Sequence, residues 1–243
     1  MIWIRSILFN VAFYLVTAVM LVGSLPVFVF GSQEAGMGVV RNWARAVLFL
    51  HEKITGARFE VRGRQYMPHG AALVASKHQS SFETIAFFPI LSNMTIVMKQ
   101  SIRALPLFGP YTVKTGMIHV DRDGGAAALR HLSARAREEI AKNREIVVFP
   151  EGTRRPVDAP PDYQGGVGLL YRSLNVPVVP VALNSGLSWP RRSLLHYPGT
   201  IVIEFLPPIP PGLDTRTFLT RLQDAIETAS SRLVAEGRAD SRR

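Results

Sequence analysis

The sequence predicts an α/β protein with a mixed, largely parallel central sheet of about seven strands, flanked by helices and preceded by an N-terminal membrane-embedded helical segment. Three observations support this prediction. The first 30 residues are almost entirely apolar, and after about residue 55 short β-like runs alternate with helical stretches. The chain has 243 residues, of which 47% are hydrophobic, so it is long enough for one catalytic-sized domain with a short appendage.

The N-terminal stretch Ile7–Phe30 is expected to enter a membrane, because no charged residue interrupts it. As one helix its 24 residues would reach roughly 36 Å, which is enough to cross a hydrocarbon core of about 30 Å. Alternatively, Gly23, Ser24 and Pro26 would break it into two short helices that enter one leaflet and return. We therefore expect residues 1–35 to form a membrane anchor, either a single span or a re-entrant hairpin.

A basic amphipathic helix is predicted over Gly36–Ile54, where Trp43, Val47 and Leu50 recur at helical spacing. This helix would begin the main domain, residues 36–243. It would lie along anionic headgroups or, alternatively, form an ordinary surface helix. Basic residues soon after an apolar segment favour a cytoplasmic body. Here these residues are Arg41 and Arg45, so we expect the protein at the cytoplasmic face of the inner cell membrane.

The rest of the chain alternates between strand and helix signals. Strands are expected at Phe59–Val61, Ala72–Ala75, Ile96–Met98, Met117–Val120, Glu145–Phe149, Val178–Leu183 and Ile201–Phe205. Helices are expected at Ser81–Leu91, Gly124–Lys142, Gly165–Leu174 and Thr217–Ala235. The polar tail from Gly237 is expected to fray.

The first candidate for chemistry is the segment 76–84, which lies between an apolar strand and an apolar helix. Such junctions are where α/β folds place their sites. Ser80 followed by Glu83 fits a capping box that begins the helix at Ser81 and leaves His78 just outside it. In that geometry the Glu83 carboxylate reaches back to accept the His78 Nδ1–H, which leaves a basic Nε2. The alternative is that Glu83 only caps the helix and His78 is an incidental loop residue.

The second candidate is the segment 147–155, an apolar strand that ends abruptly in a Gly-Thr-Arg-Arg turn. Gly152 permits close backbone approach, Thr153 offers a hydroxyl, and Arg154 presents a planar fork that matches two phosphate oxygens. The pattern indicates a phosphate-binding loop. A solvated basic turn is the alternative.

The formal charge of +10 predicts an anionic partner, such as nucleic acid, anionic lipid, an acidic protein or a phosphorylated substrate. The chain has no cysteine, which excludes disulfides, thiolate nucleophiles and cysteine-ligated metals. The sequence contains no G-x-S-x-G elbow, no H-E-x-x-H zinc motif and no recognised nucleic-acid-binding module. We therefore expect no metal, no cofactor and no nucleic-acid partner.

The two candidate segments together resemble two blocks of the glycerolipid acyltransferases. Residues 78–83 resemble the H-x4-[DE] block and residues 149–154 the F-P-E-G-T-R block. Residues 116–122 look like the family's glycine-to-arginine segment, and residues 176–181 like its late proline-bearing strand. Order and spacing agree from about residue 58 to residue 205. The resemblance is closest to the 1-acyl-sn-glycerol-3-phosphate acyltransferases, so residues 36–243 would be an acyltransferase domain.

This resemblance implies transfer of a fatty acyl chain from an acyl thioester to the sn-2 hydroxyl of 1-acyl-sn-glycerol-3-phosphate, which gives phosphatidic acid. His78 would remove the hydroxyl proton and Glu83 would orient the ring. The donor would be acyl-CoA or acyl carrier protein, the acceptor a lysophospholipid, and an anionic membrane surface a further partner. Alternatives are another lyso-lipid acceptor, such as lyso-ornithine lipid, or a non-enzymatic membrane lipid-binding protein. The implied substrate-binding residues are Gly116, Arg122, Glu151, Gly152, Thr153 and Arg154.

Three positions depart from the family pattern. Glu83 stands where Asp is most common, and its extra methylene moves the carboxylate outward by more than about 1 Å. Lys77 stands where Asn is common, and His119 replaces an aromatic residue. We expect the backbone near Glu83 to compensate and acceptor recognition to differ.

Overall fold

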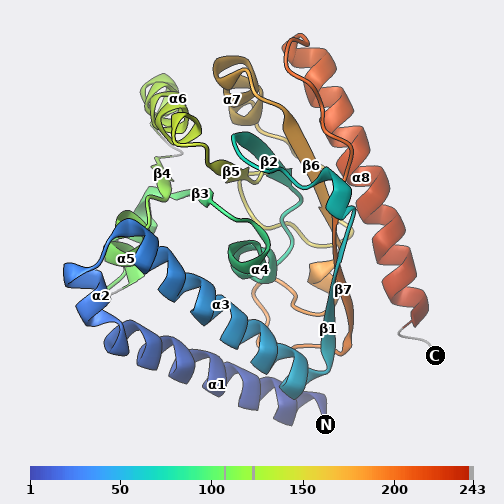
Figure 1. The fold of residues 1–243 in the computed structure, drawn as a ribbon. Helices are drawn as coiled ribbons and strands as arrows, with labels where there is room; N and C mark the ends of the chain where they lie inside the picture. The colour runs from blue at the N-terminus through green and yellow to red at the C-terminus, as the bar shows by residue number, and fades with distance from the viewer. Residues whose placement is uncertain (107, 122–123, 241–243) are drawn as a thin grey trace.

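The computed structural model describes residues 1–106, 108–121 and 124–240. Within these ranges seven strands form one sheet, and helices cover both of its faces (Figure 1). The predicted fold class is confirmed.

The strands are β1 (Ala57–Arg62), β2 (Ala72–Ser76), β3 (Met94–Lys99), β4 (Ile118–Val120), β5 (Glu145–Val148), β6 (Val178–Leu183) and β7 (Gly199–Phe205). The α-helices are α1 (Ile2–Gly23), α2 (Leu25–Phe30), α3 (Gln33–Thr55), α4 (Phe82–Ile90), α5 (Phe108–Lys114), α6 (Gly125–Ala141), α7 (Gly166–Leu174) and α8 (Thr215–Asp240). Single-turn 3-10 helices are η1 (Arg64–Tyr66), η2 (Gln100–Ala104) and η3 (Ser185–Leu187).

The strand order is β1-β7-β6-β2-β5-β3-β4, and the β6–β7 pair is antiparallel while the other neighbours run parallel. Strands β2 and β5 are adjacent at the centre, with Ala75 paired to Val148. Because parallel strands end at the same edge of a sheet, the segments after β2 and β5 begin side by side. This topology brings together the two candidate segments, which are separated by about 70 residues in the sequence.

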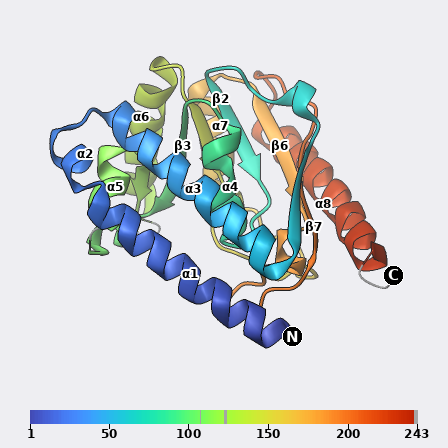
Figure 2. The same ribbon diagram turned by 60° about the horizontal axis from the view of Figure 1, so that its bottom comes forward.

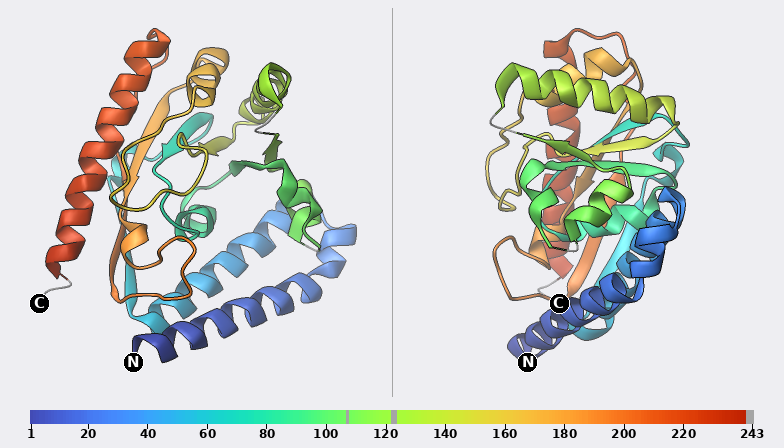
Figure 3. Two further views of the ribbon diagram at one scale, coloured as in Figure 1. Left: turned by 180° about the vertical axis from the view of Figure 1, so that it is seen from behind. Right: turned by 90° about the vertical axis from the view of Figure 1, so that its left-hand side faces the viewer.

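The sheet separates two hydrophobic layers. Val74 packs with the cluster under α1, α3 and α4, whereas Leu73 and Ala75 pack with the cluster under α6, α7 and α8. The two helical layers are visible on opposite sides of the sheet in Figure 3. Successive strand residues point to opposite faces. The alternation along β2 therefore directs Lys77 and His78, the two residues after the strand, toward different layers.

The N-terminal segment forms a helical hairpin, in which α3 runs back along α1 after the short α2 (Figure 2). Ser32 caps α3 by accepting the Ala35 N–H at 3.1 Å, and Gly56 ends it with φ of +80°. The re-entrant form expected for the anchor required a break near Gly23, Ser24 and Pro26, and α1 and α2 do meet at Ser24. The return, however, is made by α3 and not by a second short helix within residues 7–30.

The hairpin is fixed to the domain at several points. Phe9 of α1 is fully buried, with T-shaped ring contacts to His51, Trp189 and His196. Within the hairpin, the Trp43 indole N–H of α3 donates to Thr17 Oγ1 of α1 at 3.0 Å and joins the two helices. One side of α1 is thus part of the protein interior, although its composition alone would suit a membrane span.

The structure differs from the sequence-based expectation at three other elements. Helix α5 was not predicted, because Gly109 and Pro110 interrupt a short segment. Helix α8 continues to Asp240, beyond the predicted end at Ala235, so the frayed tail expected from Gly237 is wrong. Helix α3 begins at Gln33, three residues before the predicted start.

Candidate active site

His78 and Glu83 form a hydrogen-bonded pair at the carboxyl edge of the sheet. The His78 Nδ1 atom lies 2.9 Å from Glu83 Oε1. Glu83 is fully buried, whereas 12% of the His78 side chain is exposed. A carboxylate that accepts the Nδ1–H orients the imidazole and leaves Nε2 as the basic nitrogen. The contact expected from the sequence is present, and it makes His78 a candidate general base.

Four hydrogen bonds fix the Glu83 carboxylate. Besides the His78 ring, Oε1 accepts the backbone N–H groups of Gln79 and Ser80, both at 2.7 Å. Oε2 accepts the Ser185 hydroxyl at 2.7 Å. Helix α4 begins at Phe82, one residue later than predicted, and the glutamate bends back over its N-terminus. This backward reach accommodates the methylene by which Glu83 exceeds the aspartate usual in the family.

The segment after β5 holds the His78 ring from the other side. The Phe149 ring stacks on the imidazole, with centroids 3.9 Å apart and planes inclined by 18°. The Arg155 N–H donates to the His78 carbonyl at 2.8 Å. Ring orientation therefore depends on both the Glu83 hydrogen bond and the loop that carries the arginines.

The predicted phosphate-binding turn closes through a hydrogen bond from the Gly152 N–H to the Phe149 carbonyl at 2.8 Å. Gly152 has a φ of +65°, a conformation that a side chain would strain. Arg154 donates from Nη1 to Ser81 Oγ at 2.7 Å, so its guanidinium lies beside the start of α4. The turn thus presents Arg154 close to the His78 dyad.

His78 and the turn line a common apolar cavity of about 360 Å³, while Glu83 is buried behind His78. Its walls come from the α1–α3 hairpin, α4, α5 and β3. Phe88 of α4 lines it, whereas Phe82 and Phe87 of the same helix pack in the core without lining the cavity. From the turn, Gly152, Thr153 and Arg154 share the wall with His78. Other polar residues of the wall are Thr17, Ser24, Thr84, Lys99, Tyr111, Thr112 and Thr115. A mostly apolar cavity with a few converging polar groups is typical of a small-molecule or lipid site.

A second source of positive charge is the loop between β6 and β7. Partial desolvation, and then the charges of Arg192, Arg154 and Arg155, lower the pKa of Arg191 below its usual value. Arg191 is therefore close in space to the turn that carries Arg154. Sequence reasoning missed this contribution, since about 35 residues separate the two segments.

Glu151 faces away from the dyad. It is buried, and its Oε1 accepts a hydrogen bond from Lys77 Nζ at 2.9 Å. Burial, the largest cause, raises the pKa of Glu151 above its usual range, while the hydrogen bond and charge of Lys77 oppose the rise. This environment fits a role in ordering the loop. The direct substrate contact expected for Glu151 finds no support here, because its side chain is enclosed on the α7–α8 side of the sheet.

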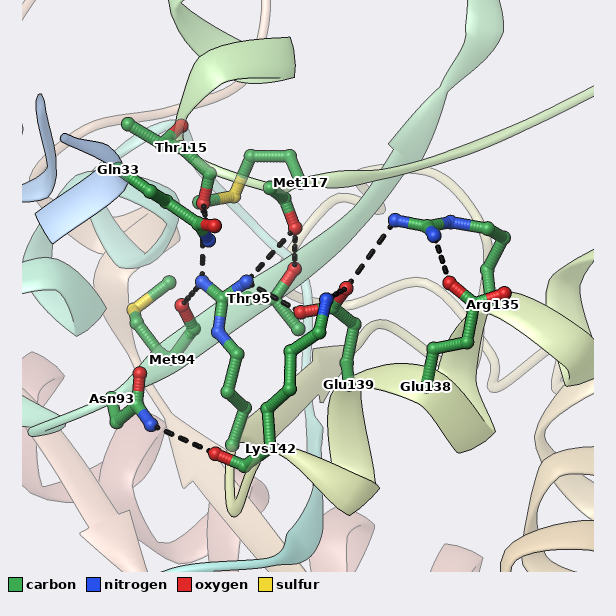
Figure 4. A network of polar contacts seen from close by, with 12 residues as sticks. Gln33, Asn93, Met94, Thr95, Thr115, Met117, Arg135, Glu138, Glu139 and Lys142 are labelled. Carbon is green, nitrogen blue, oxygen red and sulfur yellow. Dashed lines mark hydrogen bonds and ion pairs between the residues drawn. The ribbon is translucent and has the colours of Figure 1, made fainter.

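Gly116 is likewise separate from the dyad. Its carbonyl accepts hydrogen bonds from Thr95 Oγ1 at 2.9 Å and from Arg144 Nη1 at 3.1 Å, and Arg144 pairs with buried Glu139 at 2.7 Å (Figure 4). The cavity is lined by its neighbours and not by Gly116 itself. This geometry gives Gly116 a structural role in place of the substrate contact expected from its block. Arg122, the other residue of that block, lies outside the described residues.

Ser185 is the clearest functional residue that the sequence left unnoticed. It follows β6, which neighbours β2 in the sheet, so its position at the same edge could have been inferred from the strand order. The strand order itself is not readable from the sequence. Among residues 1–106, 108–121 and 124–240, no three histidine or acidic side chains gather in a way that would hold a metal ion.

Residues 58–184 match the family model described as Acyltransferase, so the chain is an acyltransferase. The 1-acyl-sn-glycerol-3-phosphate acyltransferase of Pseudomonas aeruginosa is 31% identical over 198 residues, which cover 82% of this chain and 77% of that protein. The chain belongs to the 1-acyl-sn-glycerol-3-phosphate acyltransferase family.

Two further comparisons agree. The human 1-acyl-sn-glycerol-3-phosphate acyltransferase alpha is 27% identical over 200 residues, covering 79% of this chain and 71% of that protein. The crystal structure of the 1-acyl-sn-glycerophosphate acyltransferase from Thermotoga maritima superposes with a TM-score of 0.78, covering 96% of this chain and 98% of that chain. At 19% identity this second likeness shows the shared fold.

Proposed function

We propose that the protein transfers a fatty acyl chain from an acyl thioester to the sn-2 hydroxyl of 1-acyl-sn-glycerol-3-phosphate, producing phosphatidic acid for phospholipid synthesis. One observation carries the proposal: His78, which is hydrogen-bonded to Glu83, and Arg154 line the same apolar cavity. A lysophosphatidate molecule presents a hydroxyl, a phosphate and an acyl chain within one small headgroup region. The site offers a matching base, cation and apolar wall.

In the proposed reaction His78 Nε2 takes the acceptor's hydroxyl proton as the oxygen attacks the thioester carbonyl carbon. The Glu83 carboxylate stabilises the imidazolium that results. When the tetrahedral intermediate collapses, the carbon–sulfur bond breaks, the new ester forms, and the leaving thiolate takes the proton from the imidazolium. The two substrates react directly, so no acyl-enzyme is needed.

Arg154 would hold the acceptor phosphate, because a guanidinium forms two parallel hydrogen bonds with phosphate oxygens. The Gly152 backbone and the Thr153 hydroxyl would add donors, and Arg191 would add charge at the same end of the cavity. A phosphate bound here would sit beside Ser81, the present partner of Arg154. The cavity's apolar wall would take an acyl chain.

The hairpin would bring this site to the membrane. Most large hydrophobic side chains exposed on the described surface lie along it: Ile2, Trp3, Ile4, Ile7, Leu8, Val11, Tyr14, Leu15, Val19, Val22, Leu25, Val29, Phe30 and Phe49. Patches of this kind mark membrane or protein contacts in soluble domains. Since Phe9 fixes the hairpin to the domain through Trp189 and His196, we propose that it lies in one leaflet at the cytoplasmic face of the inner membrane rather than spanning it.

The donor would be acyl-CoA or acyl carrier protein. Both are anionic, and the chain's charge of +10 would favour their approach without distinguishing them. An assay with each donor separately distinguishes them, because phosphatidic acid appears only with a thioester that the enzyme accepts.

The proposal is tested with purified protein in mixed micelles, pairing both thioesters with lysophosphatidate and lyso-ornithine lipid. We expect phosphatidic acid from lysophosphatidate, a loss of kcat of at least roughly 10³-fold in His78→Ala, and a raised KM for the acceptor in Arg154→Gln. Acyl transfer that survives in His78→Ala would exclude His78 as the general base. Faster transfer to lyso-ornithine lipid would reassign the acceptor, and no transfer to any acceptor would point to a lipid-binding protein.

A further inference from the structure

Lys77, the residue before His78, is an ammonium group enclosed in the protein. Only 2% of its side chain is exposed. Its three N–H donors meet three carboxylate oxygens: Glu151 Oε1 at 2.9 Å, Glu227 Oε1 at 2.9 Å and Glu227 Oε2 at 3.0 Å. The Tyr163 hydroxyl donates to Glu227 Oε1 at 2.9 Å. We refer to Lys77, Glu151, Glu227 and Tyr163 as the lysine cluster.

Four separate segments contribute to the lysine cluster. Lys77 follows β2 on the face opposite His78, and Glu151 comes from the turn after β5 that carries Arg154. Tyr163 lies in the connection to α7, and Glu227 lies on α8. Helix α8 begins after residue 184, where the matched acyltransferase region ends. The cluster therefore ties the C-terminal helix to the back of the site.

The charges in the cluster depend on one another. A buried carboxylate is tolerated when it is paired and hydrogen-bonded. Lys77 is the partner of Glu151 Oε1, and Glu151 Oε2 has no hydrogen-bond partner among the described residues. Burial also raises the pKa of Tyr163, so its hydroxyl stays protonated and donates to Glu227. Loss of the lysine charge would leave the buried Glu151 with only a backbone hydrogen bond from His78 and would loosen the turn that Glu151 begins.

We infer that Lys77 and Glu227 are positioning residues for acyl transfer, an inference that rests on the proposed function. Through Glu151 they hold the Gly152–Arg154 turn against the end of β2 that carries His78. Neither side chain lines the cavity. Their effect is on the position of the arginine that would bind the acceptor phosphate, so a displaced turn would weaken that contact and raise the KM for the acceptor.

The test compares Glu227→Gln with Glu236→Gln, its matched control on the same helix. Glu236 also accepts hydrogen bonds from basic side chains, Arg62 and Arg232, but away from the site. In Glu227→Gln the KM for lysophosphatidate should rise roughly 10- to 100-fold, the size expected for a lost charge-assisted hydrogen bond. The KM for the thioester should stay within about twofold. Glu236→Gln should leave both KM values unchanged.

A second variant extends the test to the lysine. Lys77→Met should lower kcat/KM more than Glu227→Gln does, and the double variant should be no worse than Lys77→Met, because both changes break the same contact. If Lys77→Met does not fold, Glu227→Gln decides the question, since Gln keeps the shape of a partly exposed side chain.

Three results would overturn the inference. The first is an unchanged KM for lysophosphatidate in Glu227→Gln. The second is a loss of kcat alone with both KM values preserved, which is what a smaller folded fraction would produce. The third is an equal effect in Glu236→Gln. Absence of transfer by the wild-type protein is a separate outcome that would refute the proposed function and this inference with it.

Discussion

At the scale of single residues, the site depends on the Glu83 carboxylate, which several hydrogen bonds hold in one position. Glu83 accepts from two backbone amides, an imidazole and a hydroxyl. The same carboxylate therefore caps α4 and orients His78. The sequence suggested these as alternative roles, but the structure shows that the two contacts share one oxygen atom. A glutamate achieves this because its longer side chain reaches back past the first turn of the helix.

Shortening this side chain should be harmful even though aspartate is common in relatives. In Glu83→Asp the carboxylate retreats by more than about 1 Å and loses contact with either the amides or the imidazole. We expect kcat to fall roughly 10- to 100-fold and the melting temperature to drop, because a buried cap is weakened. Steady-state kinetics and thermal unfolding measure both effects. Wild-type kcat in Glu83→Asp would show that backbone movement restores the contact.

At the scale of elements, a buried histidine pair fastens the α1–α3 hairpin to the domain. His51 Nε2 lies 3.2 Å from His196 Nδ1, and both rings contact Phe9 of α1. Desolvation lowers the pKa of His51 to about 3, with a further contribution from His196, and desolvation lowers the pKa of His196 to about 4. The hairpin is therefore docked on neutral imidazoles.

The stability of the protein should depend on pH through this pair. Between pH 6.5 and about 4 the unfolded chain binds protons at both histidines while the folded protein does not. The contribution of the two histidines to the free energy of unfolding should therefore be complete above about pH 6.5. As the pH drops below 6.5, the free energy of unfolding should fall by up to about 1.4 kcal/mol per pH unit for each histidine.

Urea unfolding at several pH values measures this slope. The double variant His51→Asn/His196→Asn should show a shallower dependence than the wild type. Replacement of the exposed His131 by Asn should leave the slope unchanged. Equal slopes in the wild type and the double variant would contradict the proposed role of the pair.

The elements most easily predicted were those whose patterns are local. Most of the strands were recognisable because they contain short apolar runs, and His78 with Glu83 was recognisable because both lie in one short segment. The contacts that needed the tertiary fold were not predictable: Ser185 reaches Glu83 across 102 residues, and Lys77 reaches Glu227 across 150. The return of α3 along α1 was missed for the same reason, because packing and not local sequence decides it.

At the scale of the whole molecule, the hairpin has two surfaces with different partners. One surface carries Phe9 and Trp43 into the domain and contributes Thr17, Met20 and Leu21 to the cavity wall. The other surface is apolar and exposed. In the proposed membrane orientation, a lipid that leaves the bilayer beside the hairpin would therefore enter a cavity whose wall carries His78.

The exposed surface can be tested apart from catalysis. Replacing Ile4, Val11 and Leu15 together by Ser should weaken binding to vesicles that contain phosphatidylglycerol by at least roughly 100-fold, given about 1.5–3 kcal/mol for each inserted side chain. Sedimentation with vesicles measures the change. Leu169→Ser, a similar change on α7, should bind as the wild type does. Wild-type binding by the triple variant would rule out this surface as the membrane contact.

The most direct test of the account is a structure of the protein with lysophosphatidate bound. We predict that the sn-2 hydroxyl lies within hydrogen-bond distance of His78 Nε2, that the phosphate accepts hydrogen bonds from Arg154, and that the acyl chain follows the cavity lined by Thr17 and Phe88. A phosphate bound at another face of the domain, or a hydroxyl remote from His78, would contradict it.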